Sequence, residues 1–158
     1  MGKELYRHDF VLWSTEQGRA LRRAEAAQIN TPDPIDWEHV AEEIETLGRS
    51  ERAALRSRIA VIIEHLMKLQ ASPAMPPRDD WIYSIEIQRR DIAYALEDSR
   101  SLRREIGSMI ERETPRVRAT VSRSLARHGE QPTTDVDQLS YAEDQVLGDW
   151  FPGPASQG

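Results

Sequence analysis

The chain has 158 residues, of which 39% are apolar and 30% charged, a composition typical of a globular protein. The absence of cysteine excludes disulfides, thiolate catalysis and cysteine-based metal centres, and it favours a reducing cytoplasm as the compartment. The net charge of −6 argues against broad binding to nucleic-acid backbones, because that affinity comes from many Lys and Arg side chains. The N-terminus lacks the apolar run of a signal peptide, and the longest aliphatic run, residues 59–63, is too short to span a membrane.

Helical periodicity runs through most of the chain, and no stretch shows the sustained alternation of a β-strand. The first predicted helix covers about Arg7 to Ala27 and ends before the loop QINTPDP, whose prolines hold the preceding residues extended. The predicted apolar face of this helix consists of Phe10, Trp13, Ala20, Leu21 and Ala24.

Asp36 is the predicted N-cap of the next helix. The predicted apolar face behind this cap consists of Trp37, Val40, Ala41, Ile44 and Leu47. Gly48 could end the helix, but the apolar positions continue nearly in phase as far as Leu69. The sequence therefore favours one long helix, straight or bent.

The breaker cluster ASPAMPPR at 71–78 separates this helix from the next one, for which Asp79 or Asp80 is the predicted N-cap. Ser99 or Ser101 is expected to end it. The following helix should reach Gly129, which suits a helix C-terminus, and Pro115 should kink or divide it.

Near the C-terminus, Ser140 and Glu143 have the spacing of a capping box, which predicts a short last helix. In the apolar tail that follows, Trp150 and Phe151 are expected to dock on the other helices. The predicted fold is all-α, an up-and-down bundle of about five to six helices, one of them long. We expect one domain over 1–158, with 153–158 as a flexible tail.

Three segments resemble the bacterial family Domain of Unknown Function 29. They are YRHDFVLWSTEQGRAL, DWEHVAEEIETLGRSERAAL, and IIEHLMKLQ followed by the arginine-rich WIYSIEIQRRDI. The closing LGDWFP is similar to the end of that family, so the resemblance covers nearly the whole chain. It implies a small, mainly helical bacterial protein, and it implies no activity, substrate, cofactor or catalytic residue.

A metal site of carboxylates and histidines is one interpretation, and its ligands would be His39, Glu42, Glu43, Glu64 and His65. Three observations weaken it. Established di-metal bundles repeat Glu-x-x-His on two helices, whereas this chain has one His-x-x-Glu and one adjacent Glu-His, and three of the candidates point away from the predicted apolar face. In an unbroken helix, His39 and His65 would lie about 39 Å apart at about 1.5 Å per residue, so only a hairpin at Gly48 would join them. The sequence favours a solvated acidic face with no bound cofactor, and a half-buried, hydrogen-bonded His65.

Charge is unevenly distributed along the chain. Asp36 to Glu51 holds six acids and one arginine, whereas Arg100 to Arg127 holds eight arginines and three glutamates. Four of these arginines share one helical face, namely Arg112, Arg116, Arg123 and Arg127. Such a stripe could hold phosphates, RNA or an acidic partner. The favoured alternative is a solvated face, or one neutralised by the acidic helix within the fold or across a dimer.

No nucleotide-binding, serine-hydrolase or zinc-protease motif occurs in the sequence, so enzymatic activity has no positive support. We therefore predict a non-enzymatic protein-interaction or regulatory module of a bacterial cytoplasm, binding a protein partner or itself and no membrane. The predicted contact residues are Glu42, Glu43, Arg112, Arg116, Arg123, Arg127, Trp150 and Phe151. A metal-dependent enzyme of helical-bundle type with the His/Glu site is the alternative, and nucleic-acid or phosphate binding by the arginine stripe is a further one.

Overall fold

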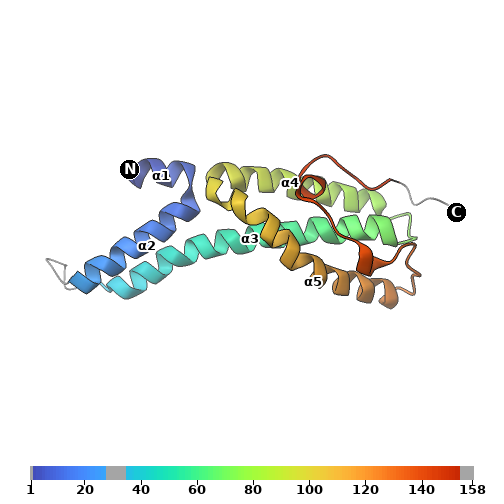
Figure 1. Ribbon diagram of the computed structural model, residues 1–158, viewed down its shortest axis with the longest axis horizontal. Helices are drawn as coiled ribbons and strands as arrows, with labels where there is room; N and C mark the ends of the chain where they lie inside the picture. The colour runs from blue at the N-terminus through green and yellow to red at the C-terminus, as the bar shows by residue number, and fades with distance from the viewer. Residues whose placement is uncertain (1, 28–34, 154–158) are drawn as a thin grey trace. The chain divides into compact units, whose positions relative to one another are not determined.

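The structure, a computed structural model, describes residues 2–27 and 35–153, most of which lie in helices (Figure 1). Six α-helices and two 3-10 helices form among these residues, and none of them belongs to a β-strand. In chain order the elements are α1 (Gly2–His8), α2 (Phe10–Ala27), α3 (Trp37–Ala71), α4 (Arg78–Asp98), η1 (Arg100–Glu105), α5 (Ile106–Arg127), η2 (Val136–Gln138) and α6 (Glu143–Leu147). The predicted all-α class is confirmed, including the one long helix and the short C-terminal one. Within the described part of the chain, no helix is both long enough and apolar enough to cross a membrane.

Backbone contacts divide the chain into two compact units. The first unit comprises the residues up to Leu55 together with Tyr94–Arg104. The second comprises Arg56–Ala93 and the residues from Glu105 onward. Helices α3 and α4 therefore contribute to both units, and the single domain expected over 1–158 stays a prediction.

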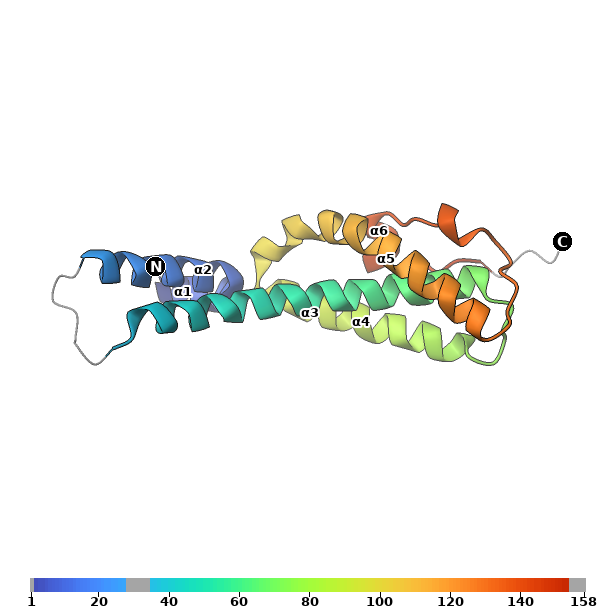
Figure 2. The same cartoon turned by 90° about the horizontal axis from the view of Figure 1, so that it is seen from below.

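In the first unit, α2 runs antiparallel to the first part of α3, and the two helices lie side by side (Figures 1 and 2). The seam between them is made of small side chains, because Ser14, Gly18, Ala41 and Gly48 are all buried there. A Cβ added at Gly18 would overlap the side chain of Glu45, and one added at Gly48 would overlap the Ser14 hydroxyl. The two backbones approach closely because these positions carry almost no side chain. Helix α3 continues through Gly48, as the sequence favoured.

The helix predicted from Arg7 to Ala27 is divided at Asp9, so that α1 and α2 are separate helices. The Asp9 carboxylate is buried and accepts a hydrogen bond of 3.0 Å from the backbone N–H of Leu12, which caps the start of α2. It also accepts bonds of 2.7 Å from the backbone N–H and the hydroxyl of Ser101. Because Asp9 is held in this capping position, the chain divides there into two helices, and the prediction of one helix was wrong.

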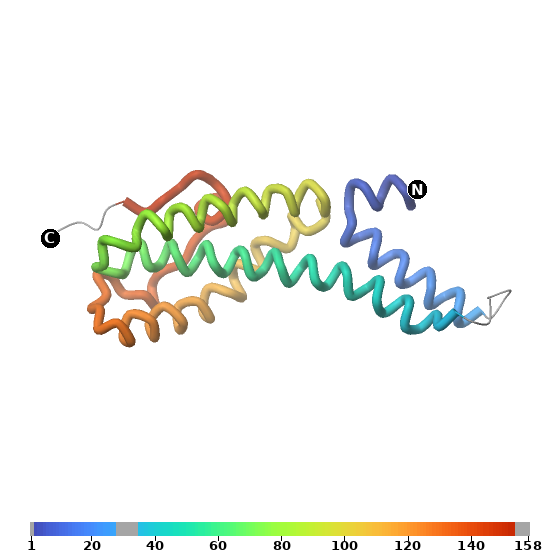
Figure 3. The backbone as a smooth tube through the Cα atoms, turned by 180° about the vertical axis from the view of Figure 1, so that it is seen from behind, coloured from blue at the N-terminus to red at the C-terminus, as the bar shows by residue number. Residues whose placement is uncertain are grey.

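In the second unit, α4 and α5 lie along α3 from Arg56 onward (Figures 1 and 3). Ion pairs join α3 to both neighbours, with Arg58 to Asp91 of α4 at 3.0 Å and Arg56 to Glu113 of α5 at 3.6 Å. The core between the helices is aliphatic, and its fully buried side chains include Ile59, Ile62, Ile63, Leu66, Met67, Ile85, Ile92, Ile106 and Val121. These are largely the periodic apolar positions of the sequence, so this unit has the core that the periodicity predicts.

Two predicted helix starts were wrong. Helix α4 begins at Arg78, which places Asp79 and Asp80 inside its first turn. There their negative charges stabilise the helix by interacting with the positive end of its dipole. Helix α6 begins at Glu143, and its N-cap is Ala142 in place of the predicted Ser140. The backbone N–H of Ala142 donates a hydrogen bond of 2.9 Å to the side-chain oxygen of Gln145.

Helix α5 runs through Pro115 without division and ends where the sequence predicts. Gly129 follows with a φ of 65°, a left-handed conformation that glycine adopts without strain, and the N–H of Glu130 donates to the carbonyl of Leu125. The predicted loop at 28–34 and the last residues of the predicted tail, 154–158, lie outside the described residues.

Candidate interaction surfaces

The first part of α3, together with Asp36 directly before it, presents a line of five exposed side chains, which we call the α3 stripe. Its members are Asp36, Val40, Glu43, Leu47 and Glu51. Val40 is 39% and Leu47 48% exposed, although the sequence places both on the buried face. That prediction was wrong because α2 packs against Ala41 and Gly48. Val40 and Leu47 directly precede these two residues, and a step of one residue turns about 100° around the helix, so their side chains point away from the seam.

The acidic residues of this segment have different environments. Glu42 and Glu43 are exposed, whereas Glu45 turns toward α2. There its carboxylate accepts bonds of 3.0 and 3.2 Å from the guanidinium of Arg22, which lowers the pKa of Glu45. Arg49 also lies within 3.9 Å of this carboxylate. Glu45 thus serves the fold of the first unit, and the exposed acids remain available to a partner.

Asp36 and His39 form a pair at the start of α3. Asp36 caps the helix, since its Oδ1 accepts 3.2 Å from the backbone N–H of His39, and its Oδ2 lies 2.6 Å from the His39 ring Nδ1. The hydrogen bond to the carboxylate raises the pKa of His39, and the same bond lowers the pKa of Asp36. His39 is therefore engaged locally by its own helix cap.

We expect Asp36→Asn to lower the pKa of His39 toward the ordinary histidine value of about 6.5, because a neutral amide stabilises the imidazolium less than the carboxylate does. Because the folded pKa of His39 is raised, its contribution to stability is fully present below the unfolded pKa and is lost as pH rises through the folded pKa. Titration of the histidine ring protons by NMR measures the shift. Glu43→Gln is the matched control, and an equal fall of the His39 pKa in both variants would contradict the pairing.

The five metal candidates are not brought together by the structure. Helix α3 is continuous, so the hairpin at Gly48 that would join His39 to His65 is absent. Glu64 is instead bound to Lys68 at 2.6 Å. His65 is half-buried as expected, but its Nδ1 is buried without a hydrogen-bond partner, and burial lowers its pKa. Among residues 2–27 and 35–153, no three His, Cys, Asp or Glu side chains are grouped as a metal site would require.

Helix α5 carries a second line of exposed side chains, which we call the α5 stripe. It contains the four predicted arginines and one alanine, namely Arg112, Arg116, Ala119, Arg123 and Arg127. The stripe lies opposite the buried Val117, Val121 and Leu125, and it continues past Pro115 because α5 is undivided there. Arg116 is partly neutralised by the buried Glu113, whose carboxylate lies 3.0 Å from its guanidinium.

Trp150 and Phe151 are half-buried against their own unit. Arg89 of α4 holds this segment, because its guanidinium donates to the carbonyl of Val146 at 2.9 Å, of Gln145 at 2.8 Å and of Trp150 at 2.7 Å. The same guanidinium lies over the Phe151 ring, 4.7 Å from its centre. Burial lowers the pKa of Arg89.

The role of Arg89 was missed in the sequence, although a signal is present. Arg89 falls between Ile85 and Ile92, at helical spacing from both, so a charge interrupts the apolar stripe of α4. An arginine in such a position needs acceptors within reach, and the carbonyls of the C-terminal segment provide them. The two aromatic side chains are therefore engaged within the chain and are weaker candidates for a partner.

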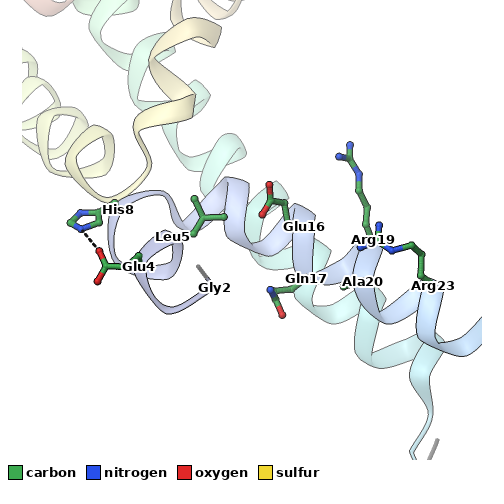
Figure 4. Close-up of a pocket in the computed structure, with 9 residues that line it drawn as sticks. All are labelled: Gly2, Glu4, Leu5, His8, Glu16, Gln17, Arg19, Ala20 and Arg23. Carbon is green, nitrogen blue, oxygen red and sulfur yellow. Dashed lines mark ion pairs between the residues drawn. The ribbon is translucent and has the colours of Figure 1, made fainter. Parts of the chain in front are cut away.

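A groove of about 910 Å³ separates α1 from α2 (Figure 4). It is lined by Gly2, Glu4, Leu5, His8, Glu16, Gln17, Arg19, Ala20 and Arg23. His8 and Glu4 of α1 form an ion pair at 3.6 Å, and α2 contributes both an acid and two arginines. Sequence reasoning missed this groove because it joined α1 and α2 into one helix. The mixed charges of the lining indicate no particular class of ligand.

Comparison with known proteins identifies the fold but no activity. The sequence matches the family described as domain of unknown function DUF29 over residues 5–151. No curated protein matches the chain. The structure is similar to the crystal structure of an alpha-helical protein of unknown function from Rhodospirillum rubrum, with a TM-score of 0.71 and 25% identity over 93% of this chain and 91% of that chain. Neither similarity indicates a specific function.

Proposed function

Since the chain belongs to the family described as domain of unknown function DUF29, whose description assigns no activity, we propose from its surfaces that it is a protein-interaction module with the α3 stripe as its contact surface. The observation that carries this proposal is the exposure of Val40 and Leu47, at 39% and 48%, between exposed carboxylates on one helix.

Single exposed apolar side chains are common on protein surfaces, but the arrangement in the α3 stripe is not scattered. Its five residues follow one another at steps of four, three, four and four, which keeps them on one line of the helix. The first three of these steps alternate four and three, as do the positions along which helices pack in coiled coils, and the last step of four keeps Glu51 on the same side of the helix. The stripe extends over about 22 Å at about 1.5 Å per residue, long enough for four turns of a partner helix.

The chemistry of the α3 stripe favours a basic helix as its partner. Val40 and Leu47 offer apolar contact, and Asp36, Glu43 and Glu51 offer carboxylates beside and between them. Long basic side chains suit both features, because their methylene stems cover apolar surface while their charged ends reach the acids. We place this contact in the cytoplasm, since a chain without cysteine is suited to a reducing compartment.

The proposal is tested by photo-crosslinking in the cells that produce the protein. The photoreactive p-benzoylphenylalanine replaces Leu47 in one variant and Ala53 in another, an exposed position about 120° away on the same helix. Irradiation should give a discrete protein adduct from position 47 and not from position 53. Adding Val40→Asp to the first variant should reduce the adduct, because it removes the neighbouring apolar contact.

Two results would count against the contact surface. One is the absence of any protein adduct at position 47, and the other is an adduct of equal yield at position 53. Either would mean that the exposed apolar residues of α3 are ordinary surface.

A further inference from the structure

We propose that the partner of the α3 stripe is the α5 stripe of a second copy of this chain. This inference rests on the proposed function and names its partner. The contact joins a surface of the first unit in one copy to a surface of the second unit in another copy.

The two stripes have the same spacing. Positions 36, 40, 43, 47 and 51 of the α3 stripe and positions 112, 116, 119, 123 and 127 of the α5 stripe both follow steps of four, three, four and four. All ten side chains are exposed. Because the steps are equal, two parallel helices can place all five positions of one stripe opposite those of the other.

The charges of the two stripes are complementary in either direction of packing. In both directions the outer arginines, Arg112 and Arg127, lie opposite the outer acids, Asp36 and Glu51. The match of the outer charges therefore holds in both directions. All five positions are in register in the parallel direction, and in the antiparallel direction the central pair, Glu43 and Ala119, is offset by one residue.

The centre of the contact is also complementary. Glu43 lies opposite Ala119, a small residue that leaves room for the carboxylate. The flanking arginines, Arg116 and Arg123, lie opposite Val40 and Leu47, where their stems can cover the apolar side chains while their guanidinium groups turn toward Glu43. Each member of one stripe thus has a suited counterpart in the other.

The test is a charge swap read by sedimentation equilibrium at low salt. One variant reverses the α3 stripe, Glu43→Arg with Glu51→Arg, and the other reverses the α5 stripe, Arg112→Glu with Arg123→Glu. Each variant alone places like charges opposite each other, so we expect its self-association constant to fall by about ten-fold or more. Mixed in equal amounts, the two variants should associate within about three-fold of the parent protein, because each stripe again meets its opposite charge.

The matched control reverses two exposed acids of α2 in the same unit, Glu16→Arg with Glu25→Arg, which lie outside both stripes and should leave association unchanged. Circular dichroism of every variant shows whether its helices remain folded, and the variant carrying all four stripe reversals should associate like the parent. Added salt should weaken the parent association, since the contact is between exposed charges.

Three outcomes would overturn the second copy as partner. They are a parent protein that stays monomeric at low salt up to millimolar concentration, reversed variants that associate as well as the parent, or a mixture that fails to restore association. A crosslink from position 47 to a different protein would then leave the interaction function standing without self-association. The absence of any crosslink would remove both.

Discussion

Gly48→Ala should destabilise the protein by about 1–3 kcal/mol, the range typical of overpacking a close interior contact. A methyl group at position 48 would overlap the hydroxyl of Ser14 across the seam between α2 and α3. Ser14 is fully buried, and its hydroxyl donates 2.9 Å to the carbonyl of Val11. The hydroxyl can move only by giving up this bond in a place without solvent, or the two helices must separate. Chemical denaturation measures the loss.

Gly107→Ala is the matched control for this substitution. Gly107 lies in the first turn of α5, is exposed, and has no atom within 4 Å of the Cβ that alanine would add. We expect it to stabilise the protein by at most about 0.5–1 kcal/mol, the gain in a helix interior, because alanine loses less conformational freedom than glycine on folding. In a Ser14→Ala background the cost of Gly48→Ala should shrink, since the hydroxyl is gone. A stabilising Gly48→Ala would show that the seam is not closely packed.

The seam also explains what could be predicted for α3. Apolar periodicity gives the length of the helix, because apolar positions recur nearly in phase from Val40 to Leu69. The same periodicity predicts the wrong buried face for the first part of α3, because it depends on large apolar side chains and takes no account of glycine. Two backbones in close contact select the small residues, so Val40 and Leu47 are turned outward.

The division at Asp9 illustrates a second limit. Asp9 is held by Ser101, a residue 92 positions further along the chain, and no local pattern announces such a partner. By contrast, the end of α5 at Gly129 depends only on local backbone geometry and was predicted correctly. Local capping signals were right at Gly129 and wrong at the starts of α4 and α6. Capping that depends on a distant segment, as at Asp9, requires the fold.

For the candidate contact surfaces, the sequence predicts which residues share a helix face better than it predicts which partners their side chains contact. Helical geometry alone places the four arginines of α5 on one face, and the structure shows all four exposed. The role of Glu45 could not be predicted, because it depends on Arg22 of the neighbouring helix. The α3 stripe could not be predicted either, because it depends on the exposure of Val40 and Leu47, which the apolar pattern assigns to the buried face.

Arg89→Ala should release the C-terminal segment and lower the free energy of unfolding by about 3 kcal/mol, since hydrogen bonds from charged donors contribute about 1.5–3 kcal/mol each and are not fully additive. The substitution removes three bonds to carbonyl oxygens and the contact with the Phe151 ring. It also leaves half-buried carbonyls without their donor. Chemical denaturation measures the loss of stability. Limited proteolysis measures the release of the segment, and the variant should be cleaved after residue 141 much faster than the parent protein.

Arg90→Ala is the matched control, because Arg90 is exposed and interacts only with the neighbouring Asp91 among the contacts of the described residues. It should change stability little, as is usual for exposed ion pairs. Arg89→Lys should resemble Arg89→Ala more than the parent protein, because a single ammonium group cannot direct donors to three carbonyls and cover an aromatic ring at once. If Arg89→Lys retains full stability and protection, the segment is held by its apolar contacts, with Trp150 against Tyr141 as the leading one, and the guanidinium geometry is not what fixes it.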